Sequence, residues 1–310
     1  YVIIRRSFYG YAMKKFYILF IFASIAIGLI YPQGEKIKFL LPYFLGASIF
    51  LNFYSIDISF RKFFRIEILY YFVITLILAP TIIFFLTSGL DINLRLGFVL
   101  IAITPVGIGS SIVVKIIDGD MELSLTNIFF FNMFAIVSYP LLIKIFFYKN
   151  AVEVPFTNIL TNLLFIILIP YVLSIIFKKT GFLKNTIKTA SKYTNYILIA
   201  VIYIAVSSSA DKIRQFDFKM LLGVFLVTFA IALSYFIIGF ILGKDLKIKK
   251  TLSVSFGQKN TGLALLISLL NFSPVTSIPT TIYIIIHHLL NATLIFISGK
   301  SAAKKDGDAV

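Results

Sequence analysis

The sequence predicts an all-α polytopic membrane protein, and its apolarity, its scarcity of charge and its long apolar runs carry that prediction. Hydrophobic residues make up 59% of the 310 residues, and the mean hydropathy is +0.98. Charged residues make up 14%, against about 25% in soluble domains, which is too few to coat a globule of this size. The apolar surface must therefore face lipid, and the continuous apolar runs exclude the alternating strands of a membrane β-barrel.

Ten apolar runs are long enough to cross a bilayer as helices, for which about 17–25 residues are needed. The first run is short, and the fourth and ninth are irregular. No stretch outside the runs is long enough for a soluble domain. The expected spans are about 16–31, 37–55, 66–88, 94–117, 123–147, 157–177, 193–210, 218–242, 250–271 and 275–298.

The basic residues sort in a way that supports this number of spans. With the N-terminus inside, 20 of the 29 Lys and Arg residues fall in inner segments and 8 in outer segments, while Lys259 falls inside a span. Because basic residues collect in cytoplasmic loops, we expect an integral protein of a bacterial cytoplasmic (inner) membrane with both termini in the cytoplasm. The same sorting accounts for the net charge of +16, so no nucleic-acid partner is expected.

The ends of the chain and its rare residue types add smaller expectations. Residues 1–12 precede Met13-Lys14-Lys15, which resembles a natural start, so they are interpreted as an N-terminal extension; a cleaved signal peptide is less favoured. The transporter domain is expected at 13–299 and a cytoplasmic tail at 300–310. Cysteine is absent, which removes disulfides and thiolate chemistry. Trp is also absent, so Tyr would have to form the interfacial aromatic belt alone.

The ten spans divide into two halves of five, about 13–150 and 151–299. An odd number of helices in each half forces the halves into opposite orientations. Each half has an irregular fourth helix, and interrupted helices at corresponding positions of inverted halves are a pointer to a transport site. The sequence therefore predicts two inverted five-helix repeats with a broken fourth and a broken ninth helix.

The first break is expected at residues 104–111, TPVGIGSS, which Asp118-Gly119-Asp120 and Leu123-Ser124 follow. Pro105 removes a helix hydrogen bond, and an opened backbone is tolerated at membrane depth only inside protein or along a cavity. Ser110 and Ser111 would then begin a half-helix, whose free N–H groups suit an anion. The alternative is a Pro-Gly kink between packed helices.

The second break is expected near residues 255–262, SFGQKNTG, where polar residues and glycines crowd at membrane depth. Lys259 is the most informative residue, because Lys249 and Lys250 already mark the inner border and Lys259 lies roughly 13 Å deeper along a helix. We interpret it as a buried functional lysine. The alternative is that the span ends here and Lys259 reaches the interface.

The third motif is Pro279 followed by His287-His288 and Asn291, which holds the two histidines of the chain. Side chains of adjacent helical residues point about 100° apart, so one histidine at most is expected to face the core. Carboxylate or Cys ligands are missing nearby, so no metal is expected. A polar contact to substrate and a structural hydrogen bond are the two roles left open.

Together these motifs resemble the bile acid:sodium symporter family. Its members have Pro-Gly-Gly-x-x-Ser-Asn, then Gly-Asp and Leu-Ser, in the first broken helix. The second broken helix has Glu-x-Gly-x-Gln-Asn-x-x-Leu-Ala, and Pro…Trp-His-Asn comes near the end. Residues 41–52 and the Arg61-Lys62-Phe63 stretch after them are also similar. The resemblance covers about residues 13–299, and the spacing between the motifs is its specific part.

The resemblance implies a ten-helix fold with a panel domain and a core domain, in which the fourth and ninth helices unwind and cross at 104–111 and 255–261. It implies a cavity near the midplane that binds a small organic anion. The substrate-binding residues it indicates are Gly107, Ile108, Gly109, Ser110, Asn260, His287 and His288.

The chain departs from the family where sodium would bind. Ser255 stands in place of a sodium-ligating Glu, and Lys259 stands in place of a Gln. Ile128 replaces a Thr. The positions equivalent to the family's ion sites are Thr75, Ser110, Ser111, Ser124, Ser255, Gln258 and Lys259. We expect the Lys259 ammonium to take the ion's place and to donate hydrogen bonds to Ser255, Thr75 and freed carbonyls.

The expected function is secondary active transport of a small organic anion, a bile-acid-like carboxylate or sulfonate, by alternating access. Transport is expected to be independent of sodium, and proton coupling would follow if Lys259 loses its proton during the cycle. No metal or organic cofactor is expected, and the partners are the substrate and the lipid bilayer. The alternatives are a sodium-coupled symporter, an arsenite or auxin-efflux type carrier, and a non-transporting receptor. An enzyme is not expected, because no catalytic cluster is found.

Overall fold

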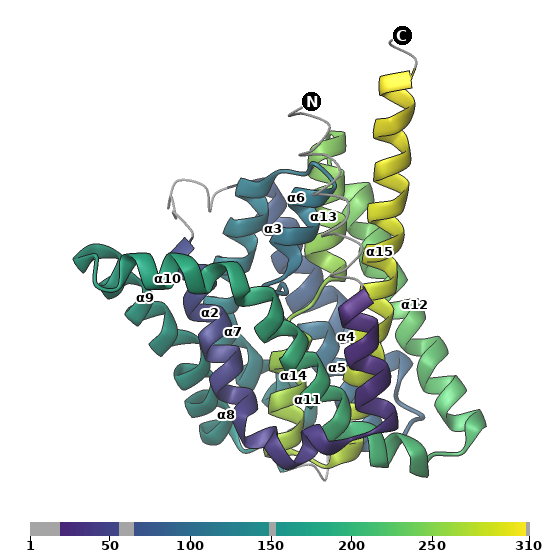
Figure 1. Ribbon diagram of the computed structural model, residues 1–310. Helices are drawn as coiled ribbons and strands as arrows, with labels where there is room; N and C mark the ends of the chain where they lie inside the picture. Colours follow the sequence, from purple (N-terminus) through teal and green to yellow (C-terminus); the bar gives the residue numbers. More distant parts are fainter. Residues whose placement is uncertain (1–18, 56–64, 149–152, 308–310) are drawn as a thin grey trace.

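The structure, a computed structural model, describes residues 19–55, 65–148 and 153–307, and within these ranges the chain is built of helices (Figure 1). The N-terminal extension expected at 1–12 lies outside the described residues. The helices of the first part are Leu19–Ile30, η1 (Gln33–Leu40), α2 (Leu41–Ser55), α3 (Ile66–Val73), η3 (Ile74–Leu78), α4 (Ala79–Leu86), α5 (Ile92–Ile103), α6 (Ser110–Ile116) and α7 (Met121–Phe147). Those of the second part are α8 (Phe156–Leu163), η4 (Leu164–Leu168), α9 (Ile169–Thr180), α10 (Lys184–Ala190), η5 (Ser191–Tyr193), α11 (Thr194–Gln215), α12 (Phe218–Leu242), α13 (Leu246–Gly257), α14 (Thr261–Asn271), η6 (Pro274–Thr276) and α15 (Ser277–Gly307).

Seven helical stretches within the described ranges are long and apolar enough to cross a membrane, and this confirms the prediction of an all-α polytopic membrane protein. The other three expected spans contain shorter apolar helices, which are Leu19–Ile30, α5 and α14. Two of the three belong to the spans predicted to be broken. Those spans are each split into two helices, α5 with α6 and α13 with α14.

Aspartates begin four of the helices, although the chain has only 13 acidic residues. Asp91, Asp120, Asp217 and Asp245 precede α5, α7, α12 and α13, and each carboxylate accepts a hydrogen bond from a backbone N–H of the first turn. An aspartate there satisfies donors that the helix itself leaves free. The two half-helices α5 and α13 are built alike, since each has an Asp cap and 12 residues.

A five-residue π-helical turn interrupts two of the long helices, at η3 and at η4. Pro80 and Pro170 follow these turns, each at the second residue of the next helical segment. Proline lacks an N–H and its ring collides with the preceding turn, so a widened turn before it relieves the clash. Thr75, one of the predicted ion-site positions, lies in η3 and is buried.

The helices pack as two groups that meet at the broken helices. In the first group, α2 contacts α9 and α11. In the second group, α12 packs along α13, and α15 packs against α5, α12 and α14. The half-helix α14 also contacts α2, α8 and α11, so it lies where the two groups meet.

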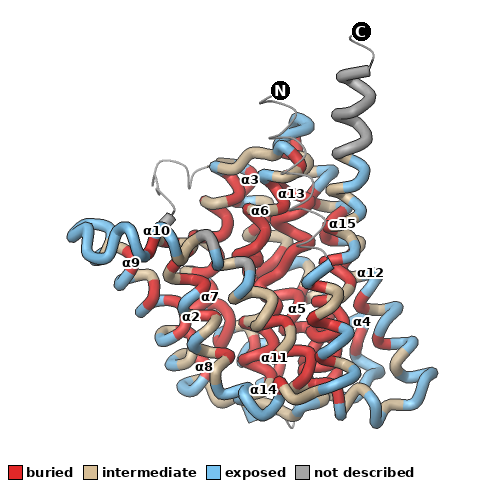
Figure 2. The backbone as a smooth tube through the Cα atoms, viewed as in Figure 1, coloured by how far each residue is buried: buried red, intermediate tan, exposed pale blue. Residues whose placement is uncertain are grey.

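Burial follows this arrangement, and the buried residues concentrate along α5, α13 and α15, while α9, α10 and α12 are largely exposed (Figure 2). The exposed side chains of α12 are mostly large and apolar, as expected for a helix that faces lipid. They are Phe218, Met220, Leu222, Phe225, Leu226, Phe229, Ile237, Phe240 and Ile241.

The tyrosines divide into exposed residues and buried residues. Several are exposed, for example Tyr43 and Tyr196. Four others are buried in the core, which are Tyr71, Tyr139, Tyr235 and Tyr283. The hydroxyl groups of Tyr139, Tyr235 and Tyr283 donate hydrogen bonds to backbone carbonyls of the broken helices.

Candidate functional site

The first break starts where Pro105 follows α5. Thr104 adopts an extended conformation with ψ of 133°, because the proline ring excludes helical geometry for the residue before it. Gly107 and Gly109 then bring the chain into α6. The second break is shorter: Gln258 is extended after α13, and Asn260 caps α14.

The two breaks cross and bind each other through their backbones. Val106 and Lys259 form an isolated antiparallel bridge. The Gly107 N–H donates to the Gln258 carbonyl at 2.7 Å, and the Asn260 N–H donates to the Pro105 carbonyl at 2.8 Å. Each break thus supplies the partners that the other lost when its helix opened, which a membrane interior requires.

Side chains hold the carbonyls at the ends of the half-helices. The Tyr283 hydroxyl donates to the Gly257 carbonyl at 2.8 Å, at the end of α13. The Tyr235 hydroxyl donates to the Ala102 carbonyl at 3.0 Å, near the end of α5. The helices on which these tyrosines lie, α12 and α15, therefore fix where each half-helix stops.

Asn260 is a structural residue of the crossover. Its Nδ2 donates to Asn132 Oδ1 at 2.8 Å, and its Oδ1 accepts from the Leu263 N–H at 3.4 Å. Asn132 Nδ2 in turn donates to the Val106 carbonyl at 2.9 Å. An Asn260→Ala variant would consequently lose structural bonds.

Lys259 is buried, with 2% of its surface exposed, so the alternative in which it reaches the interface is not what the structure shows. Its Nζ lies 3.9 Å from the centre of the Tyr235 ring and 3.5 Å from the Tyr71 hydroxyl oxygen. No carboxylate lies within ion-pair distance of it in the described ranges. Its Nζ therefore lies among aromatic rings, and the expected hydrogen bonds to Ser255 and Thr75 are not formed.

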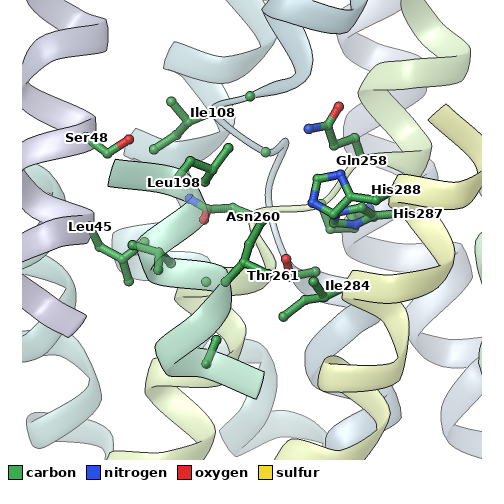
Figure 3. A pocket seen from close by; sticks show the side chains of 17 residues that line it. Leu45, Ser48, Ile108, Leu198, Gln258, Asn260, Thr261, Ile284, His287 and His288 are labelled. Carbon is green, nitrogen blue, oxygen red and sulfur yellow. The ribbon is translucent and has the colours of Figure 1, made fainter. Parts of the chain in front are cut away.

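A small cavity lies beside the crossover, between α2 and α11 on one side and α15 on the other (Figure 3). Its free volume is about 30 Å³, which is room for one or two water molecules. Polar groups at the crossover and on α15 meet an apolar wall from α2 and α11. The lining residues are Leu45, Ser48, Gly107, Ile108, Gly109, Leu198, Val201, Ile202, Ala205, Gln258, Lys259, Asn260, Thr261, Gly262, Ile284, His287 and His288.

The cavity brings together six of the seven predicted substrate-binding residues. Ser110 is the exception, because it is buried beside the crossover without lining the cavity. The expectation that only one histidine faces the core is wrong. Both His287 and His288 are buried, both line the cavity, and Figure 3 shows both rings near Gln258.

The predicted ion-site positions have mixed surroundings. The hydroxyls of Thr75, Ser110 and Ser124 are buried without a hydrogen-bond partner among the described residues. Ser255 Oγ accepts a hydrogen bond from Asn127 Nδ2 at 3.4 Å, and the Oδ1 of Asn127 is also unpartnered within those ranges. Ser111 donates weakly to the Ile108 carbonyl, and Gln258 bonds to Asn291 on α15.

Sequence reasoning did not single out Tyr71, Tyr235, Asn127 or Asn132. For the two asparagines a signal was present, because amide side chains in the middle of the apolar run 123–147 need a buried partner. For the tyrosines there was none. Tyr71 reaches Lys259 across 188 positions of sequence, and nothing local distinguishes it from an interfacial tyrosine.

Comparison with known proteins agrees with the motifs. Residues 17–297 match the SBF-like CPA transporter family. The chain is 23% identical over 239 residues to the "Uncharacterized sodium-dependent transporter YocS" of Bacillus subtilis, which covers 73% of this chain and 71% of the relative. It is 24% identical over 233 residues to the "Probable sodium/metabolite cotransporter BASS1, chloroplastic" of Arabidopsis thaliana, which covers 73% of this chain and 57% of the relative.

Proposed function

We propose, on the premise that this chain belongs to the SBF-like CPA transporter family and is a membrane transporter, that it moves a small organic anion by alternating access. The class of protein predicted from the motifs, a transporter of the bile acid:sodium symporter type, is confirmed by the family match and by both relatives. The substrate class and the coupling ion are the proposal.

The cavity lining carries the proposal for an anion. Among the described residues no Asp or Glu lines the cavity, whereas the amide and imidazole groups of Gln258 and His287 do. Thr261 and Gly262, the first residues of α14, also line it, and a helix N-terminus carries a partial positive charge that favours an anion. The apolar wall from α2 and α11 suits the hydrocarbon part of a carboxylate or sulfonate.

The small size of the cavity supports alternating access. Room for one or two water molecules does not admit an organic anion. The α2 and α11 group must therefore move away from the crossover for substrate to enter. This is the movement of a panel domain against a core domain that the family resemblance implies.

The inverted repeat and the orientation in the membrane belong to the same proposal. The matching construction of α5 and α13 and the antiparallel crossing of the two breaks support two inverted five-helix halves. That pairing and the sorting of basic residues support ten spans with both termini in the cytoplasm of a bacterial inner membrane. Reporter fusions within 178–192 and 300–310 should both read cytoplasmic, and opposite readings would exclude this number of spans.

Sodium independence is proposed from Lys259. A second unit charge about 4 Å from its ammonium would be repelled by about 4 kcal/mol at an effective dielectric of 20. The rings of Tyr235 and Tyr71 hold the ammonium in a fixed place, so the fixed charge takes the place of one bound cation. If Lys259 releases its proton in part of the cycle, transport is coupled to protons.

Uptake into proteoliposomes in sodium, potassium and choline buffers tests whether transport is independent of sodium. We expect equal rates in the three buffers, and Lys259→Gln should change the rate or its dependence on pH because it removes the charge. Uptake that only sodium supports would exclude the replacement of a coupling ion by Lys259.

A sodium-coupled symporter is the second candidate, and specific observations favour it. The unpartnered oxygens of Ser110, Ser124 and Asn127 are atoms of the type that binds sodium. Both relatives are also named for sodium. Ser124→Ala would then reduce uptake in sodium, whereas a sodium-independent carrier should tolerate it.

His287 provides the test of the substrate site. Its Nδ1 is buried without a hydrogen-bond partner in the described ranges, so His287→Leu should leave the melting temperature unchanged or raise it. Taurocholate and short carboxylates, screened by thermal shift and then by uptake, serve as probes. His287→Leu should lose the rise in melting temperature that a bound ligand gives in the native protein. Thr280→Val is the matched control, because it removes another group of α15 that has no partner in the described ranges and does not line this cavity. A normal ligand shift by His287→Leu would remove His287 from the site.

A further inference from the structure

A second cavity adjoins the first, between the helix Leu19–Ile30 and α15. Gln258 and His288 line both cavities, so they form part of the wall between them. The second cavity is smaller than the first and mostly apolar. Its lining residues are Ile21, Phe22, Val113, Gln258, His288, Asn291, Ala292 and Ile295.

The second cavity lies toward the end of the molecule at which α15 terminates. Ile284 lines the first cavity and Ile295 lines the second, and these two residues lie about 16 Å apart along α15. Val113, on α6, lines the second cavity as well, and Figure 1 shows α6 in the half of the molecule toward which α15 ends. A molecule leaving the first cavity for that end would meet the second cavity next.

One hydrogen bond ties Gln258, a residue of this wall, to a residue of the second cavity. Asn291 Nδ2 donates to Gln258 Oε1 at 3.0 Å, and both side chains are buried. A single bond between neutral amides contributes little net stability, because water or another polar group can replace it. It can therefore break and form again during a transport cycle.

One polar atom on each side of this wall has no partner among the described residues. Asn291 Oδ1 and His287 Nδ1 are buried without a hydrogen bond among the described residues. Buried polar atoms are rarely left in this state. Together with Gln258, they offer hydrogen bonds to a polar group that passes between the cavities.

We propose that Gln258, Asn291 and His288 form a gate, and that the transported molecule passes through the second cavity on its way between the first cavity and the end at which α15 terminates. The gate is closed here by the amide–amide bond. Opening exchanges that bond for bonds from both amides to the passing molecule, while the helix Leu19–Ile30 moves away from α15. This inference depends on the chain being a transporter, and not on the choice of anion or coupling ion.

The absence of cysteine makes the test direct, since one introduced cysteine is the only thiol in the chain. Ser48→Cys places a thiol in the first cavity and Val113→Cys places one in the second. A membrane-impermeant maleimide is applied to sealed vesicles of each orientation, and a C-terminal tag identifies the side to which α15 leads. Labelling rates are measured without any substrate.

We expect Val113→Cys to be labelled from the side of the C-terminal tag. Labelling of Ser48→Cys from that side should rise several-fold, up to about tenfold, when Asn291→Ala breaks the gate, because loss of one weak hydrogen bond shifts an opening equilibrium by about that factor. Gln258→Met removes the same bond from its other partner and should give the same rise.

Asn271→Ala is the matched control, because Asn271 lies on α14 and lines neither cavity. It should leave labelling of Ser48→Cys unchanged. Melting temperatures of all variants separate an opened gate from a loss of fold, in which labelling rises from both sides. Unchanged labelling in both gate variants, or labelling of Val113→Cys only from the opposite side, would overturn the proposal.

Discussion

Gly107 offers the sharpest test of how tightly the two broken helices cross. A Cβ atom added to Gly107 would lie 2.7 Å from the Lys259 carbonyl oxygen and 3.0 Å from the Gln258 carbonyl oxygen. The shorter distance is 0.7 Å less than the 3.4 Å at which ordinary contact begins. The obstacle is backbone that is itself held by hydrogen bonds, so it cannot turn aside as a side chain can. Gly107→Ala must push the two segments apart.

The cost of this substitution can be worked from two terms. Overpacking of a tight interior costs about 1–3 kcal/mol. The Gly107 N–H to Gln258 bond, 2.7 Å long, would be stretched as the segments separate, and its loss costs about 0.5–1.5 kcal/mol. Alanine returns about 0.4–1 kcal/mol by restricting the unfolded chain. The net destabilisation is therefore about 0.5–4 kcal/mol, or a fall in melting temperature of roughly 1–6 °C.

Thermal unfolding of the purified protein in detergent measures this change. Gly223→Ala is the control, because Gly223 lies on the exposed face of α12 and a Cβ there meets nothing within 4 Å. That variant should melt at the native temperature or slightly above it, since alanine favours a helix by about 0.5–1 kcal/mol. Equal melting temperatures for Gly107→Ala and Gly223→Ala would refute the reasoning that the crossover leaves no room for a side chain.

Two further changes test other parts of the structure. Arg65→Gln removes a guanidinium that lies 2.9 Å from an Asp120 carboxylate oxygen. We expect thermal unfolding to show a loss of about 1 kcal/mol of folding stability in low salt and a smaller loss in 0.5 M KCl. A loss of stability that does not depend on salt would contradict this expectation. Tyr235→Leu removes the ring over which Lys259 Nζ lies. A desolvated cation–π contact is worth up to about 2 kcal/mol. The melting temperature of Tyr235→Leu should therefore be lower than that of Tyr235→Phe, which keeps the ring.

The sequence was informative about the breaks because the bilayer leaves the backbone few choices. Pro105 with two following glycines predicted a break at 104–111, and α5 and α6 enclose one at 104–109. The second was predicted at 255–261, but only residues 258–260 leave the helix. The predicted break is too long because it counts Ser255 and Gly257 as non-helical, whereas both are helical residues buried against neighbouring helices.

The partners of Lys259 could not be predicted for a different reason. Spacing within one helix determines which residues share a face, but it does not determine which other helix packs there. Tyr71 and Tyr235 come from α3 and α12, and their positions depend on how the whole second group of helices assembles. The resemblance to a sodium-binding family suggests oxygen atoms as the neighbours of Lys259 and gives no signal for aromatic rings.

Hydrogen bonding differs between the residues that close the crossover and some of the residues that line the cavities. The groups that close the crossover are satisfied: Asn132 bonds to Asn260 and Val106, and Tyr283 bonds to the end of α13. The polar atoms without a hydrogen-bond partner in the described ranges include His287 Nδ1 and Asn291 Oδ1, which belong to residues that line the two cavities. A buried polar atom without a partner destabilises the state in which it is found. These atoms therefore favour any state of the cycle that brings them a partner, whether a water molecule or the transported molecule.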